Sequence, residues 1–244
     1  MAVQKMMRRD STSTAAVSLR PLVGDRSGNG KPPQAPALRT LRFTTEGYHR
    51  LVDVGVLGAE ERTELLNGKV FYKTPINSRH AGCVNRLVRL ISRLVESVLV
   101  APQNPVRLSD NSEPEPDVAV LRSRGDDYSD SHPRPQDVLL LIEVADSSLA
   151  VDRAVKAPLY AAAGIPELWI VDLAGEALEV YQDPDPAGYR RYRRHVRGET
   201  VISSTLPALS LTVDEILGPA ARGETAPDET APDEAAPDAS AGQD

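Results

Sequence analysis

Three ionisable side chains in the middle of the chain have types and spacing that suit chemistry on a phosphate. Asp117 opens an apolar run, and Glu143 lies inside the run 138–145, where its near neighbours are all apolar. A lone carboxylate is costly to bury in such a run, so it must be paired, protonated or bound to a metal ion. Lys156 follows on the next predicted helix. Two carboxylates and a lysine at one strand end could hold a divalent cation and meet the charge of a phosphodiester.

Each candidate also has a structural alternative. Glu143 can be an inward-facing charge paired with a buried lysine, and Asp117 can end a turn after Pro116, where aspartate is common. Glu115 is expected to be a solvated neighbour, because it lies two residues earlier on the same strand face. His80, at the start of a predicted helix, is a candidate substrate contact, although a lone histidine is more often structural.

The elements that position these residues follow from the hydrophobic pattern. Apolar residues at helical spacing predict helices over residues 44–57, 78–97 and 152–163. The dipeptide Asn67-Gly68 predicts a type I′ hairpin between strands 62–66 and 69–73. Further strands are expected at 100–108, 116–121, 138–145, 167–172, 178–182, 189–196 and 200–203, the last three as a meander. This mixture predicts an α/β fold whose fully apolar strands are central and covered on both faces.

Pro158 complicates the helix that carries Lys156. Inside a helix, proline removes a hydrogen bond and clashes with the preceding turn, at a cost of about 3 kcal/mol. The regular helix is therefore expected to start near Lys156, which shares a face with Tyr160 at the i and i+4 positions.

Length and composition predict one domain between two unstructured ends. The chain has 244 residues, of which 41% are hydrophobic. Residues 1–40 lack periodicity and are expected to be disordered, as are residues 219–244, an acidic tail rich in proline and alanine. A single domain is expected over residues 41–218. One cysteine, Cys83, permits no intramolecular disulfide, which favours a reducing compartment and a cytoplasmic location.

The net charge of −7 is distributed unevenly. Residues 219–244 carry −6, residues 1–38 carry +4, and the remainder carries −5. A net-negative body argues against tight binding of nucleic acid by bulk charge, although a local basic groove is still compatible with it. The longest apolar stretch is far shorter than the roughly 20 residues of a membrane span, so no membrane association is expected.

Limited proteolysis is expected to show the domain limits. Because the two ends have low complexity, protease should remove them early and then stop near residues 41 and 218. A fragment spanning these limits should also unfold in one cooperative transition. Protection of the acidic tail, seen as a stable fragment that keeps residues beyond 219, would show that the assignment of disorder is wrong.

An ordered set of motifs resembles one bacterial family. The pattern consists of Glu-Leu-Leu-Asn-Gly at 64–68, His80, Glu-Pro-Asp-Val-Ala-Val at 115–120, Leu-Ile-Glu-Val-Ala at 141–145, and the stretch 152–172 that ends in Ala-Gly-Ile-Pro-Glu-Leu-Trp-Ile-Val-Asp. It resembles the predicted restriction endonucleases of the PD-(D/E)XK nuclease superfamily, over about residues 41–217. The resemblance implies a restriction-endonuclease-like mixed β-sheet flanked by helices, and magnesium or manganese as cofactor.

The resemblance also assigns roles to individual residues. Asp117 and Glu143 correspond to the metal-binding carboxylates, Lys156 to the motif lysine, and Glu64 to an acidic position that can join the metal site as a catalytic residue. One departure is that Ala145 stands where the general nuclease triplet has its lysine. In this branch the lysine is displaced to the following helix, where Lys156 lies.

A basic, aromatic stretch at residues 189–195 is a candidate nucleic-acid contact. If it is a strand, Arg191 and Arg193 point to the same side and can bind phosphate. The alternative is a charged edge strand that prevents association between sheets. Helix residues Arg86, Arg89 and Arg93 are equally ambiguous.

Two hypotheses from different classes follow. The first is a metal-dependent endonuclease that hydrolyses DNA phosphodiester bonds with a metal-activated water. The second is a catalytically weak or inactive nuclease-fold module that binds nucleic acid or a protein partner. DNA is the expected partner, and a homodimer is left open by the sequence.

Overall fold

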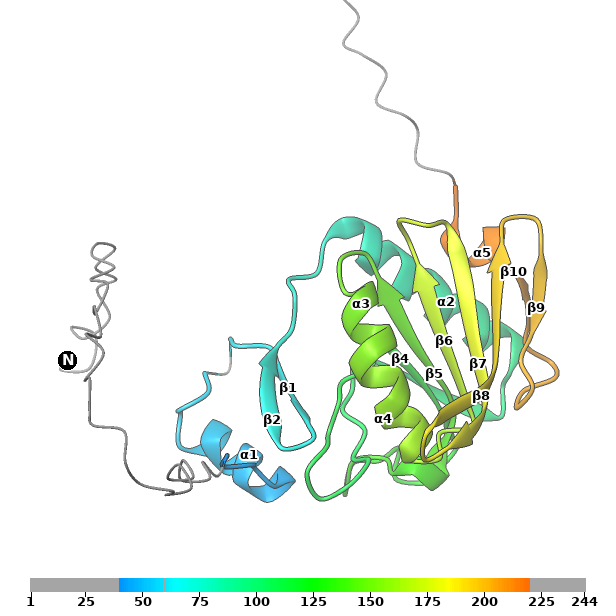
Figure 1. Cartoon of the computed structure of the whole chain (residues 1–244). Coiled ribbons are helices and arrows are strands. Elements are labelled where there is room, and N and C mark those ends of the chain that lie inside the picture. Colours follow the sequence, from blue (N-terminus) through cyan, green and yellow to red (C-terminus); the bar gives the residue numbers. More distant parts are fainter. Residues whose placement is uncertain (1–39, 59, 220–244) are drawn as a thin grey trace, which may run out of the picture. The chain divides into compact units, whose positions relative to one another are not determined.

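The computed structural model describes residues 40–58 and 60–219 (Figure 1). The disorder predicted for residues 1–40 and 219–244 falls outside this part of the chain, except at Thr40 and Pro219. From Leu41 onward the described residues form one compact α/β unit. None of its helices combines the length and the apolar character that crossing a membrane requires.

A six-stranded mixed sheet forms the centre of the unit (Figure 1), and a mixed sheet is what the family resemblance implies. Its strand order is β3-β4-β5-β6-β7-β8. Strands β5 and β6 run parallel and the other neighbours run antiparallel. The central strands are almost continuously apolar and buried, as expected for strands covered on both faces. The bounds are β3 Val98–Pro102, β4 Val118–Arg122, β5 Val138–Ala145, β6 Glu167–Asp172, β7 Ala177–Asp185 and β8 Gly188–Val196.

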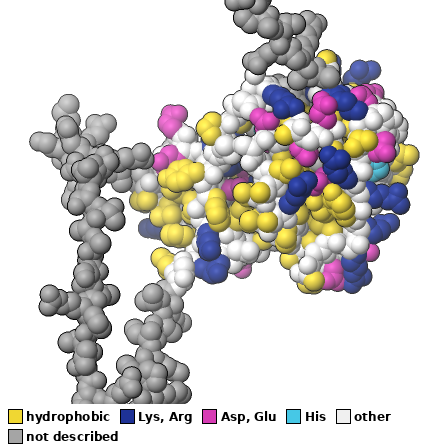
Figure 2. Space-filling model, turned by 45° about the horizontal axis from the view of Figure 1, so that its top comes forward, with side chains coloured by type: hydrophobic (Ala, Val, Ile, Leu, Met, Phe, Trp, Pro, Cys, Tyr) yellow, Lys and Arg dark blue, Asp and Glu magenta, His cyan; other side chains and the backbone are white. Residues whose placement is uncertain are grey.

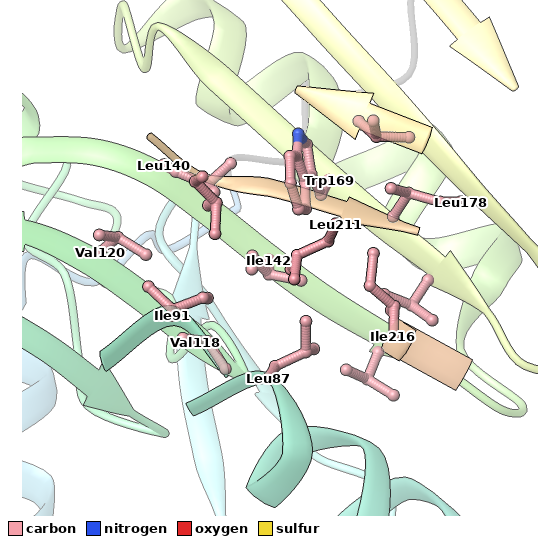
Figure 3. Close-up of a cluster of buried hydrophobic side chains, with 14 of the residues drawn as sticks. Leu87, Ile91, Val118, Val120, Leu140, Ile142, Trp169, Leu178, Leu211 and Ile216 are labelled. Carbon is pink, nitrogen blue, oxygen red and sulfur yellow. The ribbon is translucent and has the colours of Figure 1, made fainter. Parts of the chain in front are cut away.

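Helices cover both faces of this sheet. Helix α2, Ser78–Leu94, begins at the Asn77 cap and packs its apolar face behind the sheet in the view of Figure 1. It shares a core with α5, Val213–Leu217, and with a separate antiparallel pair formed by β9, Thr200–Ile202, and β10, Ser210–Thr212. Figure 3 shows this core; its labelled side chains include Leu87, Ile91, Ile142, Trp169, Leu211 and Ile216.

The opposite face is covered by a continuous helical segment from residue 149 to residue 162 (Figure 1). It consists of α3, Leu149–Val151, a π-helical turn, Asp152–Lys156, and α4, Ala157–Ala162. The Ala157 N–H donates to the Asp152 carbonyl five residues earlier, which widens this turn. Pro158, which has no N–H to donate, stands in the first turn of α4. The regular α-helix therefore starts beside Lys156, as predicted, although helical structure already begins at Leu149.

An N-terminal helix and hairpin lie beside the sheet. Helix α1, Thr45–Asp53, starts at Thr44, whose side chain accepts the Gly47 N–H. The hairpin joins β1, Thr63–Leu66, to β2, Lys69–Tyr72. Asn67 and Gly68 both have positive φ angles, 49° and 74°, as the predicted type I′ turn requires. The hairpin is the element that carries Glu64.

Several predicted boundaries differ from the structure. The helix predicted over residues 44–57 ends at Asp53, and the strand predicted over residues 116–121 begins at Val118. The helix predicted to reach residue 97 ends at Leu94, and Val98 already belongs to β3. The strand predicted over 100–108 ends at Pro102, and Gln103 has a positive φ of 53°. The predicted third strand of the terminal meander, β9, pairs with β10 and does not extend the main sheet.

The surface has mixed character. On the face in Figure 2, hydrophobic side chains gather in the middle, and lysine and arginine side chains lie scattered among and around them. This face of the described chain carries no continuous basic band. Binding of a polyanion here therefore has to depend on a few local groups, in agreement with the net-negative body.

Candidate functional site

One pocket brings together the four residues for which the sequence predicts catalytic roles. Glu64, Asp117, Glu143 and Lys156 all line a cavity of about 280 Å³ between the hairpin, the ends of β4 and β5, and the π-helical turn. His80 lines the same cavity. All four predicted catalytic side chains are at least nine-tenths buried. Residues separated by up to 92 positions in the sequence thus meet in one place.

Glu143 lies near the C-terminal end of the buried strand β5 and is held by two donors. Its Oε1 accepts a hydrogen bond of 2.6 Å from the Tyr160 hydroxyl and one of 3.2 Å from the Lys156 ammonium. Lys156 reaches this position from the π-helical turn. The pairing of Glu143 with a buried lysine, which the sequence left open, is therefore present in the structure.

Glu64 lies on the other side of the same ammonium. Its Oε2 is 3.3 Å from Lys156 Nζ and accepts the backbone N–H of Glu115 at 3.2 Å. Lys156 therefore bridges the hairpin and the main sheet. It also occupies the space between Glu143 and Glu64.

Asp117 stands immediately before β4 and is held by strand β5 and helix α2. Its Oδ2 accepts the Val144 N–H at 2.8 Å and lies 3.0 Å from His80 Nε2. Burial works to raise the pKa of Asp117, but the His80 and Val144 hydrogen bonds outweigh it and hold the pKa below its usual value. Val118 of β4 pairs with Ile142 of β5. Asp117 and Glu143 are the next positions on these antiparallel strands, so they lie side by side.

The pocket contains a further buried carboxylate that the sequence analysis did not identify. Asp152 is buried, lines the pocket and accepts a 2.6 Å hydrogen bond from the Ser148 hydroxyl. Its spacing of four residues from Lys156, on one predicted helix, was the available signal.

The cluster has more negative charge than its own cation neutralises. Burial raises the pKa of Glu143 to about 8 although Lys156 opposes this shift, and burial also raises the pKa of Asp152. Burial would lower the pKa of Lys156, but the charges of Glu143 and Glu64 hold it above its usual value. Burial therefore favours the protonated forms of Glu143 and Asp152, whereas the hydrogen bonds to Asp117 favour its ionised form.

Two basic residues of the hairpin region also line the pocket, and neither was identified from the sequence. Lys73 Nζ donates to the Glu115 carbonyl at 2.6 Å and to its carboxylate at 2.9 Å, and Arg62 donates to the same carboxylate at 2.7 Å. Glu115 is therefore not the solvated neighbour that the sequence suggested. It anchors two positively charged side chains at the pocket.

The residues present fit a hard divalent cation. Hydrogen bonds and ion pairs among the described residues engage one oxygen of each predicted ligand: Oδ2 of Asp117, Oε1 of Glu143 and Oε2 of Glu64. The second oxygen of each carboxylate stays available to a metal ion.

The three carboxylates do not bring ligand atoms within 4.8 Å of one another in the part of the chain that the structure describes. Lys156 separates Glu64 from Glu143, so Asp117 and Glu143 are the better matched pair. Mg²⁺ usually takes only one or two protein carboxylates.

The structure does not bring Arg191 and Arg193 to this pocket. Both lie on the edge strand β8, three strands away from β5, and line a separate depression with β9. Arg193 is paired with Val180 and Arg191 with Gln182 on β7. A substrate contact through these two residues would therefore involve DNA that extends well beyond the carboxylate cluster.

Comparisons with known proteins agree with this architecture. The sequence matches the Uma2 family, described as "Putative restriction endonuclease", over residues 45–214. The fold is similar to a crystal structure described as "a putative nuclease belonging to DUF820" from Anabaena variabilis, with a TM-score of 0.57 and 16% sequence identity. That similarity covers 72% of this chain and 97% of the other. No curated protein matches the sequence.

Proposed function

Because the chain belongs to the Uma2 family of restriction-endonuclease-like proteins, we propose that it is a metal-dependent endonuclease that hydrolyses DNA phosphodiester bonds. The observation that carries the proposal is the convergence of Asp117, Glu143 and Lys156 in one buried pocket. No serine or cysteine nucleophile is needed for such a reaction. The described fold and the family support nuclease chemistry in general.

Asp117 and Glu143 are proposed to hold one Mg²⁺ or Mn²⁺ ion, with Glu64 as a further ligand or as the residue that positions Lys156. When bound, the ion supplies an activated water and neutralises charge on the phosphate. His80 and the Val144 N–H fix the Asp117 carboxylate. The Tyr160 hydroxyl fixes that of Glu143.

Lys156 is proposed to orient the attacking water through a hydrogen bond or to stabilise the negative charge that develops on the reacting phosphate. Its ammonium is buried and held in one place by Glu143 and Glu64, so little reorganisation is needed when negative charge develops. Lys73 and Arg62 are proposed to meet the phosphates that flank the cleaved bond. Arg191, Arg193 and His80 remain proposed contacts to DNA.

A plasmid assay tests the proposal. Supercoiled plasmid incubated with the full chain and Mg²⁺ or Mn²⁺ should become nicked or linear, whereas the same mixture with EDTA should leave it supercoiled. An Asp117→Ala preparation made in parallel controls for a contaminating nuclease. Equal cleavage by this variant, or cleavage that persists in EDTA, would contradict the proposal.

One observation favours the second hypothesis, a catalytically weak or inactive module that binds nucleic acid or a protein partner. Lys156 already neutralises part of the carboxylate cluster, because its ammonium lies within 3.3 Å of both Glu143 and Glu64. A gel-shift experiment that shows DNA binding, without cleavage under any divalent cation, would support this module. A homodimer and a cytoplasmic location stay predictions from the sequence.

A further inference from the structure

A second cluster of metal-ligating side chains lies outside the catalytic pocket. His49 on α1, Glu113 in the segment before β4, and His132 in the segment before β5 each offer a ligand atom, and these atoms lie within 4.8 Å of one another. Among the described residues, this is the one group of three such side chains that meets this distance. None of the three lines the catalytic pocket.

Glu113 is the feature that points to a missing cation. It is only 3% exposed, and its Oε1 contacts His49 Nε2 at 2.5 Å. Its Oε2 is buried and has no hydrogen-bond partner among the described residues. A buried carboxylate oxygen without a partner carries the desolvation cost of a charged group that no hydrogen bond offsets. A bound cation would remove this cost.

The two imidazoles are placed to complete such a site. The rings of His49 and His132 lie 6.2 Å apart between centroids and meet edge to face at 72°. Both side chains are partly or fully exposed, so each can rotate at little cost. Ligand atoms about 2.1 Å from a tetrahedral zinc ion stand about 3.4 Å apart. A side-chain rotation of His132 can therefore close the remaining separation.

We infer that His49, Glu113 and His132 form a zinc site that is distinct from the catalytic cluster. Two imidazole nitrogens and one carboxylate oxygen are a donor set that zinc uses when three ligands come from the protein, with water in the fourth position. The donor atoms of the two sites also favour different metal ions. Imidazole suits zinc and related transition ions, whereas the carboxylate oxygens of the catalytic pocket suit Mg²⁺ or Mn²⁺.

The position of the site would let a bound zinc ion connect separate elements of the fold. Glu113 exchanges backbone hydrogen bonds with Leu65, the neighbour of Glu64, at 2.7 and 3.3 Å. His49 comes from α1, which is otherwise fixed here through the Tyr48 hydroxyl and its bond to the Thr63 carbonyl at 2.9 Å. Zinc would therefore tie α1 and the segment around His132 to the strand segment that supports Glu64. This inference goes beyond the proposed endonuclease activity and does not depend on it.

Zinc titration of the full chain tests the inference. Protein stripped with EDTA is titrated calorimetrically with Zn²⁺ in the presence of excess Mg²⁺, which competes for the carboxylate pocket. We expect one zinc ion per chain. His132→Ala should weaken zinc binding by a factor on the order of 100 or more, since even loss of a residue that only supports a ligand costs about 10–100-fold. Because His132 is exposed, this variant should fold normally.

Matched variants separate this site from others. His195→Ala, which alters a histidine that lies near Glu199 and outside the cluster, should leave zinc affinity unchanged. Thermal melting should show that zinc raises the Tm of the wild-type chain by roughly 5 °C at 100 times its Kd, with no such rise for His132→Ala. Unchanged zinc affinity in His132→Ala would overturn the inference. So would zinc binding that is lost in His80→Ala and kept in His132→Ala, because the ion would then occupy the catalytic pocket.

Discussion

Asp117→Ala and Glu143→Ala should each abolish metal-dependent cleavage and weaken Mn²⁺ binding sharply. Both changes remove a ligand from the same proposed ion, so each should lower the cleavage rate by a factor on the order of 10³ or more. The double variant should add little to either single one, because the two residues act as a unit. Calorimetric titration with Mn²⁺ and a plasmid assay measure the two effects.

Two further variants exclude a loss of structure as the cause. Asp117→Asn keeps an acceptor for the Val144 N–H but carries no charge, so it should fold and still fail to bind Mn²⁺. Asp110→Ala removes an aspartate whose side chain is 90% exposed and should behave as the wild type. If Mn²⁺ affinity were unchanged in both Asp117→Ala and Glu143→Ala, the proposed metal site would be wrong.

Lys156→Met is the second substitution with a large expected effect. In buffer without divalent cations it should lower the free energy of unfolding by roughly 3–5 kcal/mol, because Glu143 and Glu64 lose the buried ammonium between them. Cleavage should fall by a factor on the order of 10² or more, as for the loss of a preorganised charge. Mn²⁺ binding should persist, since an ammonium cannot be a metal ligand.

Melting the same variant with added Mn²⁺ tests whether the ion and Lys156 neutralise the same carboxylates. Added Mn²⁺ should raise the melting temperature of Lys156→Met more than that of the wild type, because the ion replaces part of the missing positive charge. Lys69→Met, at an exposed position of the hairpin formed by β1 and β2, should change neither stability nor cleavage. A Lys156→Met protein that is badly destabilised but still cleaves DNA at the wild-type rate would show that Lys156 has a structural role alone.

The elements closest to the proposed catalytic residues could be predicted well from the sequence. Residues 138–145 and 167–172 are short apolar runs bounded by polar or turn residues, and their strands have the predicted limits. The Asn67-Gly68 dipeptide predicted the hairpin correctly, because both residues tolerate the positive φ that the turn needs. The carboxylates Asp117 and Glu143 stood out because a charge in such a run requires a partner.

Other features depend on tertiary structure that the local pattern does not contain. Val95 and Val98 continue the helical spacing of α2, but Val98 packs against the same core from β3, so the predicted helix was too long. The π-helical turn, which brings Lys156 between Glu143 and Glu64, has no signal in the hydrophobic period. The strand order, which places Arg193 at the edge of the sheet, likewise cannot be derived from the strands alone.

Anomalous diffraction from crystals of the full chain grown with Mn²⁺ tests the central claim most directly. The claim is that one divalent cation is held by Asp117 and Glu143 in the pocket that contains Lys156. The predicted result is an anomalous peak about 2.1 Å from a carboxylate oxygen of each residue. Absence of a peak at these carboxylates, with manganese bound only at His49, Glu113 and His132, would contradict the claim.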